Sequence, residues 1–129
     1  METKEVGLLE VLAKDKDENV RSSVAGNDNC PVGLLEVLAK DKNDYVRRAV
    51  AENVKTPSEL LEVLVKDKDE GVRCWVARNE HTPLEVLEIL AKDKDDIVKL
   101  YVSMNDNTPL KIKKSLDKLQ LDLDYGFDE

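Results

Sequence analysis

The sequence predicts an all-α fold, an α-solenoid built from 26-residue repeats of two helices each, with no β-sheet core. The first observation is the spacing of the four prolines, which stand 26 residues apart at Pro31, Pro57, Pro83 and Pro109. The second is that the same phrase of leucines, Lys-Asp pairs, Val-Arg and asparagine returns around each proline. A fixed period of this length is typical of units that bury their apolar faces by stacking on their neighbours.

The repeats predict one domain that covers residues 1–129. Its parts are four repeats over 6–31, 32–57, 58–83 and 84–109, a capping helix over 110–118 and an acidic tail over 119–129. Four units exceed the roughly three that a stable array needs. The largely polar last helix is typical of a terminal unit that caps a stack.

The first helix of each unit is predicted from its start signal and its apolar arc. In the third unit Thr56 stands as N-cap, Pro57 as the first helical residue and Glu59 as the third, which makes a capping box on a proline. The arc that follows is expected to be buried and contains Leu60, Leu61, Val63 and Leu64.

The second helix of each unit is expected to be short, about two turns. Residues that cap helices well precede it in every unit: Asp17, Asn43, Asp69 and Asp95. An asparagine ends it each time, at Asn27, Asn53, Asn79 and Asn105. Asparagine tolerates the left-handed conformation after a helix and hydrogen-bonds locally in turns, so we expect it to stop the helix in this way.

Together these recurring positions of the repeat resemble the leucine-rich repeat variant motif. The phrase Val-Arg-x-x-Val-Ala-x-Asn, then Thr-Pro, then x-x-Leu-Leu-x-x-Leu is seen over 46–64 and 72–90, and the resemblance covers about residues 6–118. It implies a strand-free, right-handed superhelix of α-helices that alternate with short helices of α or 3₁₀ type. Nothing matches the N-terminal cysteine cluster that holds an iron-sulfur centre in the family's founding member, so no cofactor is expected.

Three substitutions depart from the motif. They are Cys30 for Thr, Lys99 for Arg and Ser103 for Ala. Cys30 stands at a helix start, where the dipole can lower the pKa of a thiol, although we favour an inert substitution. Cys30 and Cys74 lie in different columns of the repeat, so we expect two free thiols, as in a reducing compartment.

Net charge and hydropathy narrow the function classes. The chain carries 28 acidic and 20 basic residues, a net charge of -8, which disfavours non-specific binding to nucleic acid. No apolar run approaches the roughly 18 residues that span a bilayer, and the first residues do not resemble a targeting segment. We therefore expect a cytoplasmic protein.

No reactive centre can be assembled from the side chains. Asp15, Asp17 and Asn19 match the first ligands of a calcium loop, but Val20 stands where that loop needs glycine, so helix capping explains the aspartates better. The single histidine, His81, lies in a linker with no second imidazole, and we expect a polar turn residue. Neither a zinc site nor a nucleophile with its base follows, so we expect no metal site and no enzyme.

The equivalent positions whose residue differs from unit to unit are the candidates for a binding surface. A position that packs between units keeps the same kind of residue, whereas a position that faces a ligand need not. The apolar character of the varying positions grows toward the C-terminus. Aromatic, methionine and arginine side chains are the usual anchors of protein interfaces. The sequence thus predicts a non-catalytic scaffold, a protein interaction module with an unidentified partner. Its candidate contacts are Trp75, Leu100, Tyr101, Met104, Arg48 and Arg78.

The alternative function is a solenoid that binds an anion or nucleic acid through a basic column. The residues available for it are Arg21, Arg47, Arg48, Arg73 and Lys99. Acidic residues three and four positions earlier, such as Glu18 and Asp17 before Arg21, allow local pairing within each helix. We favour this pairing over a binding role for the column.

The tail alternates apolar and polar residues with the period of a strand. Its apolar members are Leu119, Leu121, Leu123, Tyr125 and Phe127. Two interpretations stay open, a frayed acidic end or an extended segment that docks on Leu100 and Met104 or on a neighbouring chain, which would give self-association.

Overall fold

The chain folds into two layers of helices in a computed structural model that describes residues 4–117. No β-strand occurs within this range. One layer contains α1 (Lys4–Leu12), α3 (Val32–Leu38), α5 (Ser58–Leu64) and α7 (Leu84–Leu90). The other contains α2 (Glu18–Ala25), α4 (Asp44–Glu52), α6 (Glu70–Arg78) and α8 (Asp96–Met104). A last helix begins at residue 110 and is described to residue 117.

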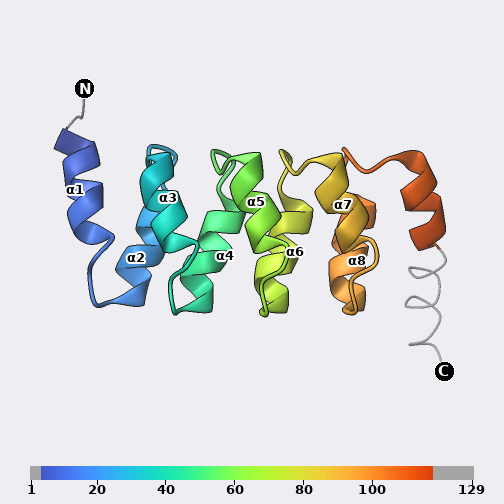
Figure 1. Cartoon of the computed structure of the whole chain (residues 1–129), viewed down its shortest axis with the longest axis horizontal. Helices are drawn as coiled ribbons and strands as arrows, with labels where there is room; N and C mark the ends of the chain where they lie inside the picture. The colour runs from blue at the N-terminus through green and yellow to red at the C-terminus, as the bar shows by residue number, and fades with distance from the viewer. Residues whose placement is uncertain (1–3, 118–129) are drawn as a thin grey trace.

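Successive helix pairs lie side by side, so α1 and the last helix are at opposite ends of the array (Figure 1). In Figure 1 the odd-numbered helices form the near layer and the even-numbered helices the far one. Each even-numbered helix packs directly on the next, α2 on α4, α4 on α6 and α6 on α8. The all-helical prediction is confirmed for the described residues, and the packing is that of a helical repeat.

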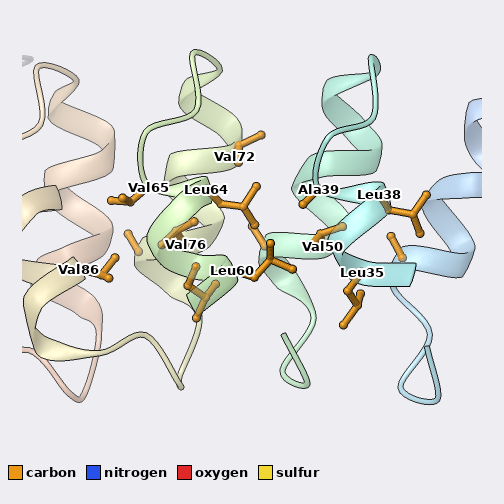
Figure 2. Close-up of a cluster of buried hydrophobic side chains, with 14 of the residues drawn as sticks. Leu35, Leu38, Ala39, Val50, Leu60, Leu64, Val65, Val72, Val76 and Val86 are labelled. Carbon is orange, nitrogen blue, oxygen red and sulfur yellow. The ribbon is translucent and has the colours of Figure 1, made fainter. Parts of the chain in front are cut away.

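The core runs the length of the array between the two layers. The helices α3, α5 and α7 contribute pairs of fully buried leucines, such as Leu61 and Leu64, and α4, α6 and α8 contribute buried valines one turn apart, such as Val72 and Val76. Figure 2 shows these side chains following one another from unit to unit. Full burial of one such side chain contributes about 1.5–3 kcal/mol, so the stacked units supply the stability that one unit lacks.

The predicted buried arc of the first helix is too wide by one residue. Leu60, Leu61 and Leu64 are buried, but Val63 is 57% exposed. Each odd-numbered helix has the other layer on one side only, and Val63 lies on the side that faces away from it. Val11, Val37 and Ile89 repeat this exposure in the other units.

The predicted capping box at the start of the first helix is wrong. Pro57 itself is the N-cap, and its carbonyl accepts hydrogen bonds from the backbone N–H of Leu60 and Leu61 at 3.0 and 3.1 Å. The Thr56 hydroxyl instead donates backward to the carbonyl of Val50, at 2.6 Å. The threonine therefore secures the end of α4, where a helix leaves carbonyls without partners.

The predicted caps of the second helices are confirmed. The side chains of the four cap residues accept hydrogen bonds from backbone N–H groups of the first turn, with donors at Asn19, Tyr45, Val72 and Ile97. These helices have eight or nine residues, so they are about two turns long, as expected. They are nevertheless longer than the seven-residue α3, α5 and α7, and no 3₁₀ helix occurs within residues 4–117.

Asparagine is the C-cap of α4, α6 and α8, but not in the predicted conformation, whereas α2 ends one residue earlier with Gly26 as its C-cap, so the prediction for Asn27 is wrong. Asn53 has φ −65° and ψ 121°, which is extended, and no residue within the described range has a positive φ. Its Oδ1 accepts a hydrogen bond from the backbone N–H of Lys55, which is the local turn bond that was expected.

The same asparagine also joins its unit to the preceding one. Asn53 Nδ2 donates to the carbonyl oxygens of Ala25 and Asn27, at 2.8 and 3.1 Å. Asn79 and Asn105 repeat both bonds one unit further along each time. We call this set of bonds the asparagine stitch. It satisfies carbonyls at the end of each preceding even-numbered helix, and it does not follow from the sequence pattern.

A second link between units corrects the predicted local pairing of the arginine column. Arg47 Nε donates to Asp67 Oδ2 at 2.9 Å, and its Nη1 donates to the carbonyl of Asp41 at 2.8 Å. Arg21 and Arg73 form the same bidentate pairs with the carboxylate 20 residues later. Local pairs are formed by Lys99, with Asp96 at 3.2 Å, and by Arg48, with Asp44 at 3.0 Å. Within residues 4–117, none of the buried guanidinium groups of Arg21, Arg47 and Arg73 forms a salt bridge with the acids three and four residues earlier.

None of the helices within residues 4–117 has the length and apolar content needed to cross a membrane. The predicted tail over 119–129 and the end of the predicted capping helix at 118 lie outside the described residues.

Candidate functional site

The six predicted contact residues all lie on the even-numbered helices. Arg48 is on α4, Trp75 and Arg78 are on α6, and the other three, Leu100, Tyr101 and Met104, are on α8. The valines of these helices turn inward, so the variable columns lie on the surface that faces away from the odd-numbered layer. We call this surface the even face.

Four of the six residues form one cluster, which we call the C-terminal patch: Trp75, Arg78, Tyr101 and Met104. The Arg78 guanidinium carbon lies 4.0 Å from the centre of the Trp75 ring and 4.8 Å from the centre of the Tyr101 ring. Trp75 and Arg78 are three residues apart on α6, and Tyr101 occupies the position equivalent to Trp75 in the next unit. Both rings pack partly against the core, whereas Arg78 is exposed.

The patch combines an unneutralised cation with apolar surface. No carboxylate within residues 4–117 forms a salt bridge with Arg78. Met104 is 63% exposed, and a shallow hollow of about 180 Å³ lies between Arg78, Tyr101, Met104 and Asn105. Contact with two rings restricts the guanidinium, and the planar fork of N–H donors that any arginine carries matches a carboxylate.

Arg48 is not part of this cluster. Its guanidinium forms a bidentate pair with Asp69, at 2.8 and 3.1 Å, and also contacts Asp44 at 3.0 Å. Gly71 provides the space, because a Cβ there would lie 2.3 Å from the Arg48 guanidinium carbon. Arg48 therefore links α4 to α6. Leu100 lies one turn before Met104 on α8 and is half-buried.

The link between Arg48 and Asp69 predicts a dependence of stability on pH. The hydrogen bond from Arg48 lowers the pKa of Asp69; burial opposes this, and the Val72 N–H adds to the lowering. A carboxyl with a lowered pKa in the folded state stabilises above its unfolded pKa of about 4, and this contribution is lost as pH falls. We expect Arg48→Met to cost about 1 kcal/mol at pH 7.

Urea unfolding of the wild type and Arg48→Met across pH 7 to 2.5 measures this effect. The difference between the two proteins should shrink as the pH falls below about 4, because Asp69 then becomes neutral in both. A difference that stays constant over this range would show that the pair with Asp69 does not stabilise the fold.

Each residue of the alternative basic column already has a carboxylate partner. Three of them are buried and bind the following unit: Arg21, Arg47 and Arg73. The hydrogen-bonded Asp67 carboxylate raises the pKa of the Arg47 guanidinium. Arg48 and Lys99 are paired as described above.

The two cysteines are free and shielded. Burial raises the pKa of the Cys30 thiol, so the lowering that a helix start could produce does not occur there. The helix that follows begins only at Val32, with Pro31 as its N-cap. Burial is also the main cause of the raised pKa of the half-buried Cys74.

His81 is exposed, and its backbone N–H donates to Asn79 Oδ1, as expected of a turn residue. Asp15 and Asp17 each accept a backbone N–H two residues later, which is the local capping that was predicted for them. Within residues 4–117, no group of three or more His, Cys, Asp or Glu side chains could hold a metal ion.

Two exposed features were missed at the sequence level. Tyr45 on the even face is 62% exposed, and the Arg48 guanidinium carbon lies 4.9 Å from the centre of its ring. The odd-numbered layer carries two shallow grooves of about 450 and 530 Å³, one between α3 and α5 and one between α7 and the last helix. Ala39 and Ala91 line the equivalent position in each groove. The small alanine side chain at this position of both units was the sequence signal that could have indicated the grooves.

Comparison with known proteins identifies the repeat. Residues 70–95 match the model of the family described as leucine rich repeat variant. This stretch of the chain is similar to a leucine rich repeat variant unit. The matched segment runs from the start of α6 through α7 to the N-cap of α8, so it contains Asn79, one donor of the asparagine stitch, and the Thr-Pro linker. The predicted resemblance is thereby confirmed. Searches of curated proteins and of solved structures found no match to the chain.

Proposed function

We propose that this leucine rich repeat variant array is a non-catalytic scaffold that binds a protein partner on its even face. The observation that carries the proposal is the C-terminal patch, in which Arg78 stacks on two aromatic rings and has no salt bridge within residues 4–117. Arginine, tryptophan and tyrosine dominate the binding energy of protein interfaces. Here the three types meet at one exposed place.

The chemistry of the patch selects the partner. Arg78 offers parallel N–H donors to a carboxylate, while Met104 and the Tyr101 ring offer an adaptable apolar surface beside it. The partner segment that fits therefore presents Asp or Glu next to an apolar side chain. The second cation of this face, Arg48, is already paired with two carboxylates and supports the scaffold.

We propose further that the array is a right-handed superhelix of 26-residue units forming one domain over residues 1–129 of a cytoplasmic protein. The spacing of the prolines and the equal spacing of the links between units support the repeat length. Direct packing between successive even-numbered helices supports a continuous curved stack.

A role in binding polyanions has less support. All five cations of the basic column pair with carboxylates of the same chain, and the net charge is -8. Binding measured across a salt series separates the two functions, because phosphate contacts release counterions and weaken steeply with salt. Little binding to a duplex oligonucleotide is expected even at low salt.

A displayed library of random peptides tests the protein-binding proposal. Peptides selected on the immobilised wild-type protein are expected to be enriched in Asp or Glu next to Leu, Met or Phe. Arg78→Glu should weaken the selected peptides at least tenfold, since a carboxylate would then face a carboxylate. Lys66→Glu is the matched control, because it makes the same change of two charge units at an exposed site outside the patch.

The proposal requires that the two variants differ. Peptides that bind Arg78→Glu as tightly as they bind the wild type would overturn it, as would equal losses in both variants, which would indicate a response to net charge alone. A selection that returns no acidic preference would contradict the predicted partner chemistry.

A further inference from the structure

The odd-numbered layer carries an exposed apolar column on its outer surface. We call the surface of this layer that faces away from the even-numbered helices, the last helix included, the odd face. The column has one branched apolar side chain in each of four units, between 54 and 68% exposed: Val11, Val37, Val63 and Ile89. A position that keeps the same kind of apolar residue behaves as a packing position, yet these side chains are open to solvent. Exposed apolar surface of this extent marks an interaction site.

A groove between α3 and α5 interrupts this surface. Its volume is about 450 Å³, and its apolar lining includes Val32, Ala39, Leu60 and Val63. Between α5 and α7 the position equivalent to Ala39 holds the larger Val65, which is buried. Because helices pack by placing the ridge of one into the groove of another, the groove between α3 and α5 suits a helix of a partner.

The walls of this groove carry three exposed charges. Glu59 lies at the start of α5, Glu36 lies midway along α3, and Lys40 lies just after the end of α3. None of the three forms a salt bridge within residues 4–117. In the direction of the helices, the signs therefore run negative, negative, positive.

The last helix carries the opposite order of charges. Lys111, Lys114 and Asp117 are exposed and form no salt bridge within residues 4–117. Lys111 stands where α5 and α7 have a glutamate, and Lys114 stands where all four preceding helices of this layer have one. Leu110 begins the helix and is 66% exposed. The last helix thus combines an apolar side chain with charges that complement the groove between α3 and α5.

A two-fold axis can join two odd faces in two ways. If both arrays run in the same direction, each helix meets its own equivalent, and the lysines of the two last helices face each other. If the arrays run in opposite directions, the helices of both copies point the same way, because the odd-numbered helices and the last helix are all parallel (Figure 1). The last helix then matches the groove in level as well as in sign. Lys111 and Glu59 hold equivalent positions in their units, as do Lys114 and Glu36.

We propose that the odd face is the interface of a homodimer in which the last helix of each copy, residues 110–117, lies in the groove between α3 and α5 of the other copy. Lys111 pairs with Glu59, Lys114 with Glu36 and Asp117 with Lys40, while Leu110 packs on Val32. The two-fold axis forms every contact twice. The even face stays open in this dimer, so the inference does not depend on its proposed function.

Sedimentation velocity over a concentration series tests the proposed interface. The wild type is expected to dimerise, and Lys111→Glu should raise the dimer Kd at least tenfold, because two pairs of carboxylates then face each other. Glu59→Lys should act in the same way through two pairs of lysines. The double variant Lys111→Glu with Glu59→Lys should return the Kd to within about threefold of the wild-type value.

Lys94→Glu is the matched control for the charge change. It replaces an exposed lysine in the turn before α8, outside the odd face, and should leave the Kd within about twofold. All the substituted side chains are exposed, so each variant should keep the circular dichroism spectrum of the wild type.

Four results would overturn the proposal. A wild type that stays monomeric at every concentration would exclude the dimer. A double variant that dimerises no better than the single variants would mean that Lys111 and Glu59 do not meet. Equal effects of Lys111→Glu and Lys94→Glu would indicate a response to net charge alone. A dimer that is lost in Arg78→Glu but kept in Lys111→Glu would place the interface on the even face.

Discussion

Replacing Asn79 by alanine is expected to lower the free energy of unfolding by about 2–4 kcal/mol. The Asn79 side chain is buried, and its Nδ2 donates to the carbonyls of Ala51 and Asn53 at 2.8 and 3.2 Å. Alanine would leave both carbonyls without this donor at a joint from which water is excluded. Because the joint lies mid-array, we also expect urea unfolding followed by circular dichroism to become broader, as the two halves separate.

The N-terminal unit offers a control for this prediction. Asn27 accepts the local turn bond from the N–H of Asn29, as Asn79 does from His81, but within the described residues its Nδ2 reaches no preceding unit. Asn27→Ala should therefore cost only about 0.5–1 kcal/mol, the value of the turn bond. Equal losses in the two variants would mean that the asparagine stitch adds nothing to stability.

Removing the carboxylate of Asp67 is the second change with a large expected effect. Asp67→Ala leaves the guanidinium of Arg47, which is buried beneath the turn, without its bidentate partner. An unpaired charge in such a place is more costly than the pair is worth, and we expect a loss of about 2–3 kcal/mol in urea unfolding at pH 7. Double replacement of Arg47 by Met and Asp67 by Ala should recover part of this loss, since no charge then stays uncompensated.

Asp15 provides the matched control for Asp67. Its Oδ1 accepts the N–H of Asp17 at 2.9 Å, just as Asp67 accepts the N–H of Asp69 at 2.9 Å. No arginine within the described range forms a salt bridge with the Asp15 carboxylate, and Arg21 bonds only to its backbone carbonyl, which alanine keeps. The difference between Asp67→Ala and Asp15→Ala thus isolates the link to the preceding unit. A difference below about 0.5 kcal/mol would contradict a stabilising role for this link.

Local features of the fold followed from the sequence. The caps of the second helices were predictable because a side chain such as that of Asp69 hydrogen-bonds a backbone group only a few residues away. The inward columns were predictable because helical periodicity places Val72 and Val76 on one side. The period of the prolines then predicted how many such pairs would follow one another.

The links between units could not be predicted in the same way. Arg47 has acidic residues within one turn of its own helix as well as Asp67 in the next unit, and only the stacking geometry decides between them. The Thr56 hydroxyl likewise had a plausible local role as a cap, but in the structure it bonds to Val50, six residues earlier. Contacts of this kind depend on the distance between helices, which no sequence window contains.

Only part of the candidate site could be predicted from the sequence. Variation between units identified the even face, and helical spacing placed Trp75 next to Arg78. Stacking of Arg78 on Tyr101 of the following helix required the structure, as did the separation of Arg48 from the cluster. The exposure of Val63 was missed because an apolar residue beside two buried leucines gives no sign of how far the opposite layer extends.

The asparagine stitch has a consequence for how such a protein can change in length. Its acceptors are backbone carbonyls, which every unit presents whatever its side chains, and its donor is one residue at the end of the next unit. A unit copied within the gene would therefore fit between any two others without compensating substitutions. Residues 6–16 and 32–42 are identical, which is the trace that such copying leaves. Growth by whole units, with variation confined to the exposed columns, would let evolution alter the reach of the array and its binding surface separately.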